Sequence, residues 1–385
     1  MSALVQAVST RRLPPVDNLK SVMVAWVIAG HALLGYSAIG GWPYDEVNEV
    51  TFDGRSELAL AVVFGPSALF VMGTFFFLAG LFAPGSLARR GPARFAVDRA
   101  LRLGVPFLCF VLLFWPLFMW FAYLAAGHRV SYWWVFTHRQ PFLDSGPLWF
   151  AEVLLIFSLA YAAWAGYAAR RRRRPEREPG AVRSGHLVAA TVAVAVVTFA
   201  VRLVAPARST QILDLHVWQW PQCAALFVMG IAVSARGWAA AVPERVHRGC
   251  GRAVAATIAV VPVLAVAFGV SNLAADAGPF LGGWHWQAAA LAGVEACLVV
   301  AGSVWILGLA QRRLAHAGPL STACGRAAFA AFVLQAPVLL TLAIAARPLD
   351  LPAEGKAVLV GLLAVPTCFG LGRLFIDRTP LRGIL

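Results

Sequence analysis

Long apolar segments recur along this chain, and they limit its fold more than any other feature of the sequence. Each has about 20 residues, and a helix rising about 1.5 Å per residue can cross the hydrocarbon core of a bilayer with that length. Inside lipid, a helix also satisfies its own backbone hydrogen bonds. We therefore predict an all-α polytopic integral membrane protein with about ten transmembrane helices. The predicted spans are 21–39, 58–83, 103–126, 148–169, 186–205, 217–235, 253–273, 284–310, 327–346 and 356–375. Pro106 and Pro116 interrupt the third span and predict a bend in it.

The composition agrees with this class and excludes others. Of the 385 residues, 60% are hydrophobic and only 13% are charged, and the mean hydropathy is +0.73. The 32 Lys and Arg residues exceed the 18 Asp and Glu residues, but they lie between apolar segments and not on one soluble face. The sequence therefore predicts no nucleic-acid partner. The six cysteines are scattered without a CxxC spacing, so we expect neither disulfides nor a metal site.

The basic residues also predict the orientation. Most of them fall in alternate connections, and Lys and Arg are retained on the cytoplasmic side of a membrane. Both termini are therefore predicted to be cytoplasmic, in a multi-pass protein of the cell membrane. No connection is long enough for a soluble domain, so we expect one membrane-embedded domain over 1–385. Its cytoplasmic parts would include the N-terminal segment 1–20 and the basic loop 170–185, whose arginine run 170–174 would contact anionic membrane lipids.

An ionisable residue lies inside the first predicted span, VDNLKSVMVAWVIAGHALLGYSAIGGW. This residue is His31, and Lys20 precedes it by eleven positions. At about 100° per residue, eleven positions come within about 20° of three full turns, so both side chains project from one face about 16 Å apart. Lys20 would then lie at the cytoplasmic boundary and His31 near the middle of the bilayer. Lys20 could instead be a snorkelling flank residue, and His31 could fix helix packing through a hydrogen bond. Because a buried imidazole can act as a general base near neutral pH, His31 is the leading catalytic candidate.

Two arginines begin the third span. Arg99 and Arg102 are three residues apart, which places them on one face of an α-helix. Guanidinium groups match phosphate geometry, so this pair, with Lys20, could bind the phosphates of a nucleotide-bearing cosubstrate. Retention of basic residues on the cytoplasmic side is the simpler alternative for the pair.

Carboxylates and tryptophans add further candidates. Glu152 and Glu295 lie within predicted spans, where ionisable groups are costly. Glu152 could form an internal ion pair with Arg202, which lies at a similar depth of the next span, whereas Glu295 has no basic partner evident from the sequence. Either glutamate could orient or charge-balance the imidazole. Trp42 is typical of an interfacial aromatic belt, and could also line a carbohydrate site.

These segments together resemble the acyltransferase-3 family of membrane proteins. The opening VDNLKSVMVAWVIAGHA resembles the family start LDGLRAIAVLLVVLFHA, and its R-x10-H motif appears here as Lys20-x10-His31. TFFFLAGLF at 74–82 is similar to FFxLSGF, and Arg99, Arg102 and Pro106 are similar to RxxRxxxP. GPLWFAEVLLIF at 146–157 resembles LWFLxxLLxFY. GRAAFAAFVLQAPVL at 325–339 resembles GxxSFxIYLLHxPVL, with Gln335 in place of its histidine.

The resemblance implies a ten-span enzyme that takes an acyl group from cytoplasmic acyl-CoA, with acetyl-CoA as the expected donor and no permanently bound cofactor. The acceptor would be a hydroxyl of a glycan, a lipid or a small molecule. His31 would be the family's histidine, and it would either deprotonate the acceptor hydroxyl or briefly carry the acyl group itself. Lys20, Arg99 and Arg102 would lie on the CoA side. The alternatives to an acyltransferase are a transporter or flippase, and a non-catalytic relative with the same fold. The sequence leaves open whether the protein works as a homodimer.

Overall fold

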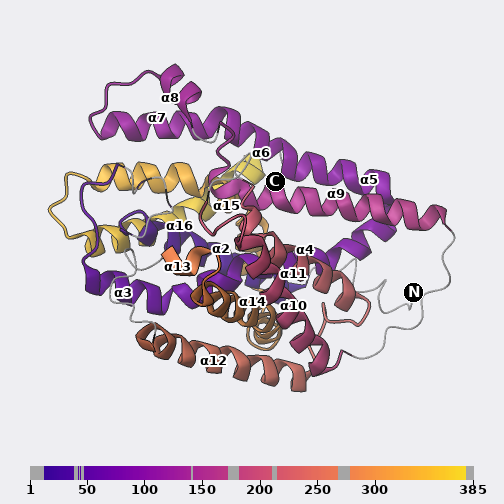
Figure 1. Ribbon diagram of the computed structural model, residues 1–385. Coiled ribbons are helices and arrows are strands. Elements are labelled where there is room, and N and C mark those ends of the chain that lie inside the picture. The colour runs from indigo at the N-terminus through magenta and orange to yellow at the C-terminus, as the bar shows by residue number, and fades with distance from the viewer. Residues whose placement is uncertain are drawn as a thin grey trace.

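The computed structural model describes residues 13–38, 42, 44, 47–139, 142–171, 182–209, 215–267 and 278–378. Within these residues the regular structure is helical and contains no strand, which confirms the all-α class (Figure 1). The helices are α2 (Pro14–Leu34), α3 (Gly54–Val63), α4 (Gly65–Arg90), α5 (Pro92–Arg99), α6 (Val105–Cys109), α7 (Trp115–Ala125), α8 (Tyr132–His138), α9 (Trp149–Arg170), α10 (Ser184–Arg202), α11 (Trp220–Ser234), α12 (Glu244–Ala267), α13 (Gly278–Leu281), α14 (Trp286–Arg313), α15 (Pro319–Ala346) and α16 (Ala353–Arg378). Short π or 3₁₀ turns are η2 (Ala100–Gly104), η3 (Phe110–Phe114), η4 (Gly146–Leu148) and η6 (Val217–Gln219).

Long helices occur at all ten predicted spans, and eight of the described helices are long and apolar enough to cross a membrane. The first span, α2, is not one of the eight, because Asp17, Asn18, Lys20 and His31 lower its mean hydropathy. The seventh, α12, is described only as far as Ala267, before the predicted end of that span. Ten is therefore an approximate number of spans. Parts of the predicted N-terminal segment and of the basic loop, 1–12 and 172–181, lie outside the described residues.

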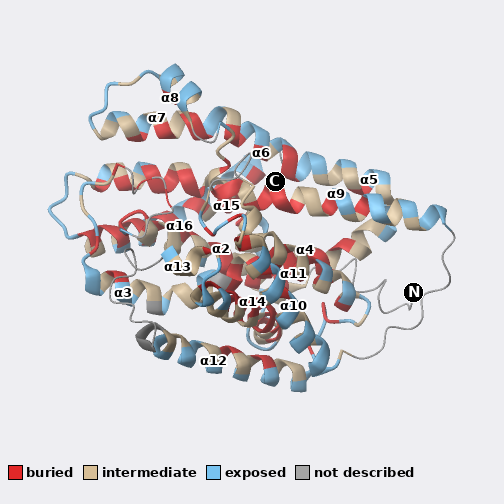
Figure 2. Ribbon diagram, in the orientation of Figure 1, coloured by how far each residue is buried: buried red, intermediate tan, exposed pale blue. Residues whose placement is uncertain are grey.

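Helix α2 lies inside the bundle. It packs against α4, α14, α15 and α16. Figure 2 shows many buried residues along these helices, whereas α12, at the lower edge of the view, is largely exposed. The polar residues of α2 therefore belong to a helix that packs against four others, and the interior of a bundle is where ionisable groups in membrane proteins are tolerated. This placement explains how a helix with Asp17, Lys20 and His31 can exist within the apolar bundle.

Helices α4 and α11 approach each other very closely. A Cβ atom at Gly80 would overlap the carbonyl oxygen of Phe227, and one at Gly230 would overlap the carbonyl oxygen of Phe77. Each glycine thus faces the backbone of the other helix, as is typical of membrane helices that associate through small residues. Gly80 belongs to the TFFFLAGLF segment, so the glycine of that motif serves helix packing here.

The third predicted span lies in one continuous helical segment of 34 residues, Pro92–Ala125. This segment contains two π-helical turns. Pro106 and Pro116 each stand at the second residue of the α-helical segment that follows a π turn. A proline has no N–H and its ring clashes with the carbonyl four residues earlier, which for both prolines lies within the π turn. The wider turns accommodate the prolines that the sequence analysis associated with a bend.

The helices have one markedly basic end. We call it the basic end, and it is where α4, α9, α14 and α16 finish with Arg89, Arg90, Arg170, Arg312, Arg313 and Arg378.

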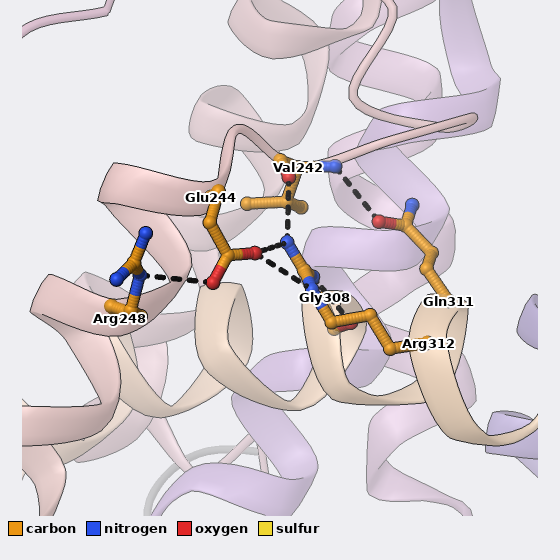
Figure 3. A network of polar contacts seen from close by, with 6 residues as sticks. All are labelled: Val242, Glu244, Arg248, Gly308, Gln311 and Arg312. Carbon is orange, nitrogen blue, oxygen red and sulfur yellow. Dashed lines mark hydrogen bonds and ion pairs between the residues drawn. The ribbon is translucent and has the colours of Figure 1, made fainter.

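Hydrogen bonds and an ion pair fix the segment between α11 and α12 at the basic end (Figure 3). Arg312 donates to Glu244 at 2.6 and 3.0 Å and to the carbonyl of Val242 at 3.2 Å, while Gln311 accepts from the Val242 amide at 2.8 Å. The start of α2 joins this end, because Asn18 donates to the carbonyls of Leu314 and His316 at 2.8 and 2.9 Å.

Candidate active site

His31 lies in the last turn of α2, and not at the middle of a span as the sequence analysis placed it. The difference arises because the helix begins at Pro14 and ends at Leu34, several residues earlier at each end than predicted. After Gly35 the chain turns: the carbonyl of Tyr36 accepts from the Phe52 amide at 2.9 Å, and Glu57 accepts from the Ser37 hydroxyl at 3.1 Å and from the Ala38 amide. These contacts stop α2 one turn beyond His31.

Two side chains hold the imidazole ring of His31. Its Nδ1 is 2.9 Å from Oε1 of Gln335 on α15, and its ring stacks on Trp42 with centroids 4.3 Å apart and planes 17° apart. With the amide oriented in this way, Oε1 accepts, so Nδ1 carries the proton and Nε2 keeps a lone pair. His31 itself is only half-buried. The site therefore contains an oriented imidazole whose Nε2 has no hydrogen-bond partner in the part of the chain that the structure describes, as a base requires.

The segment that carries Trp42 is itself anchored to α15 and α16. Tyr44 donates to Glu49 at 2.8 Å, and the buried Lys356 donates to the same carboxylate at 2.6 Å. Arg347 donates to the carbonyl of Val47 at 2.7 Å. These contacts pack the segment over the end of α2 opposite the basic end, and they keep the Trp42 ring against His31.

Lys20 and Arg99 come together near the basic end. The ammonium group of Lys20 lies 5.6 Å from the centre of the Phe82 ring and 3.7 Å from Asp17, and Arg99 is close enough for its charge to act on Lys20. The guanidinium of Arg99 lies 5.1 Å from the Phe95 ring, and its Nε has no hydrogen-bond partner among the described residues. Two neighbouring cations that are incompletely neutralised favour an anionic ligand between α2 and α5.

Arg102 has different neighbours from Arg99. Asp98 forms ion pairs with Arg102 at 3.1 Å and with Arg90 at 2.5 Å. The π turn η2 begins at Ala100, directly between the two arginines. A π turn rotates less per residue than the α-helix that the sequence analysis assumed, so the two side chains diverge. Of the predicted arginine pair, Arg99 is therefore the one whose charge acts on Lys20, while Arg102 is exposed and paired with Asp98.

Glu295 has a basic partner that the sequence analysis did not find. Its Oε2 is 2.7 Å from Nη2 of Arg202 and accepts from the Gln222 amide at 2.8 Å. The side chains of Arg202 and Glu295 are 1% and 7% exposed, so this ion pair is almost fully buried. Arg202, which was considered as a partner for Glu152, thus binds Glu295 instead. Glu152 lies in the first turn of α9, where a carboxylate is favoured by the helix dipole.

Comparison with known families identifies the family of this chain. The family model Acyl_transf_3, described as an acyltransferase domain, matches residues 14–373, nearly the whole chain. The chain belongs to the acyltransferase-3 family. Searches of curated proteins and of solved structures found no match. Membership confirms the resemblance predicted from the sequence and supports a membrane acyltransferase over a transporter.

The acyltransferase-3 match also makes the His31–Gln335 contact informative. Gln335 stands where the family's late-span motif has a histidine, but the sequence alone does not predict its contact with His31. The partner could not be derived from spacing, because 304 residues separate the two. Trp42 was interpreted as part of an aromatic belt, although it stacks on His31. Two motif segments far apart in sequence thus meet at one imidazole.

Proposed function

We propose that this membrane acyltransferase moves an acyl group, acetyl first among the candidates, from acyl-CoA to a hydroxyl of a glycan, a lipid or a small molecule. The observation that carries the proposal is the oriented imidazole of His31, whose Nδ1 contacts Gln335 and whose Nε2 has no hydrogen-bond partner among the described residues. The match to the acyltransferase-3 family over residues 14–373 supports the reaction class.

In the proposed reaction, Nε2 of His31 accepts the proton of the acceptor hydroxyl as its oxygen attacks the thioester carbonyl. A carbon–oxygen bond forms and the carbon–sulfur bond breaks. The proton then passes from His31 to the departing CoA thiolate, so the imidazole returns to its starting state. No metal or redox step is needed for this exchange.

Lys20 and Arg99 would bind the phosphates of acyl-CoA. Their neighbouring charges are incompletely neutralised, and Lys20 precedes His31 by about 16 Å along α2. An extended phosphopantetheine arm has a comparable length, so phosphates at Lys20 would bring the thioester toward His31. In this proposal the basic end faces the cytoplasm of the cell, where acyl-CoA is made, as the distribution of arginines also predicts.

We expect His31→Ala to lower acyl transfer by about 10²-fold or more, because a positioned general base contributes about 10² to 10⁴ to the rate. The measurement is transfer of label from acetyl-CoA into products, in membranes of the source cells that carry each variant or lack the protein. His316→Ala is the matched control, because its side chain is exposed and only its backbone carbonyl makes a described contact. Full transfer by a folded His31→Ala protein would remove His31 from the mechanism.

We expect Arg99→Ala to raise KM for acyl-CoA by about tenfold or more while kcat changes little. A hydrogen bond to a charged group contributes about 1.5–3 kcal/mol, and this contact would be made equally in the bound and reacting states. Arg94→Ala is the control, because Arg94 is an exposed arginine of the same helix α5. An equal rise of KM in both variants would indicate a general effect of positive charge and not a site at Arg99.

A further inference from the structure

Gln335 is a buried polar residue of the described bundle core whose amide is only partly hydrogen-bonded. Its side chain is fully buried near the middle of α15, in a stretch whose other buried residues, such as Ala331, Ala336 and Leu339, are apolar. Its Oε1 contacts Nδ1 of His31 at 2.9 Å, while its Nε2 has no hydrogen-bond partner among the described residues.

This arrangement is costly for a residue that only fills space. A buried amide group with an unsatisfied donor costs about 1–3 kcal/mol, and a leucine or methionine of similar volume would avoid that cost. Among the described residues, the hydrogen bond between Gln335 and His31 is the contact that offsets this cost. The amide is therefore placed for the imidazole and not for packing.

We propose that Gln335 is a positioning residue for catalysis: its Oε1 keeps the proton of neutral His31 on Nδ1, so that Nε2 always presents a lone pair to the acceptor hydroxyl. The inference rests on the proposed function and adds the residue that sets the tautomer. The tautomer of a histidine is determined by the hydrogen bond of its other nitrogen.

The contact also limits how protons move. An amide neither takes up nor releases a proton under ordinary conditions, so the Nδ1 proton cannot pass to Gln335. The acceptor's proton must enter and leave through Nε2 alone. Trp42, stacked on the ring face, restricts rotation that would exchange the two nitrogens.

Three variants test the proposal in the labelled acetyl-CoA assay. Gln335→Leu removes the acceptor at similar volume, and we expect kcat to fall at least about tenfold while KM for acyl-CoA stays within twofold, because Gln335 lies far along α15 from the basic end. Gln335→Glu is isosteric and retains an acceptor oxygen, so we expect it to restore kcat to within a few fold. Gln335→Met serves as a second apolar variant in case the leucine variant does not fold. Wild-type kcat in a folded apolar variant, or equal losses in the glutamate and apolar variants, would overturn the proposal.

The tautomer can also be observed without altering Gln335. Solid-state ¹⁵N NMR of histidine-labelled protein in membranes separates Nδ1–H from Nε2–H imidazoles, and His31→Gln assigns the signal. We expect the Nδ1–H form for His31, and an Nε2–H form would contradict the inference. Absence of transfer by the wild-type protein would refute the proposed function, whereas transfer that needs His31 but not Gln335 would refute only the role of Gln335.

Discussion

Glu295→Ala is expected to destabilise the folded protein by about 3–5 kcal/mol, the usual effect of removing one partner of a buried ion pair. The side chain of Arg202 is 1% exposed. Two of its three guanidinium nitrogens, Nε and Nη1, have no hydrogen-bond partner among the described residues. Without Glu295, its charge would stay buried in the bundle, 5.4 Å from the centre of the Trp218 ring. The free energy of unfolding in detergent, followed by helical circular dichroism, measures the loss.

A double variant separates a structural role of Glu295 from a catalytic one. Arg202→Met with Glu295→Met removes both charges, and replacing a buried pair by apolar groups of similar volume is often neutral or stabilising. We therefore expect the double variant to recover most of the stability lost in Glu295→Ala, and to recover acyl transfer with it. Recovered stability without recovered transfer would instead return Glu295 to the catalytic group predicted from the sequence.

Gly230→Ala is expected to separate α11 from α4 and to cost about 3 kcal/mol, at the upper end of the usual range for overpacking. The added methyl group would overlap the Phe77 carbonyl, and a neighbouring backbone atom cannot turn aside as a flexible side chain can. Helix α4 also packs on α14, where Thr74 and Ser303 share a buried hydrogen bond of 2.9 Å. The shift would therefore spread into the central bundle, and the apparent Tm in detergent should fall.

Gly293→Ala is the matched control for this experiment. Gly293 lies within α14, but a Cβ atom there would meet nothing within 4 Å. Alanine is favoured over glycine in a helix by about 1 kcal/mol, so this variant should be as stable as the wild type or slightly more so. Equal losses at both glycines would mean that the close approach of α4 and α11 is not what makes Gly230 necessary.

Features that depend on a single helix could be predicted well from the sequence. The apolar segments predicted the long helices, because crossing a bilayer imposes a length and a polarity that a sequence displays directly. The stretch from Lys20 to His31 likewise lies within α2, since both residues belong to one uninterrupted helix. Even here local structure intervened: the π turn at Ala100 separated Arg99 from Arg102, and no simple spacing predicts such a turn.

The amino-acid sequence by itself thus determined the all-α membrane class, the family and the candidate histidine, since length, hydropathy and ordered motifs are properties of the chain. Only the tertiary structure decided the partners: Gln335 and Trp42 for His31, and Arg202 for Glu295. Each of the two polar contacts, to Gln335 and to Arg202, joins different helices. Which helices become neighbours depends on close packing, such as that of Gly80 against α11, and this packing is a property of the whole bundle that no single segment specifies.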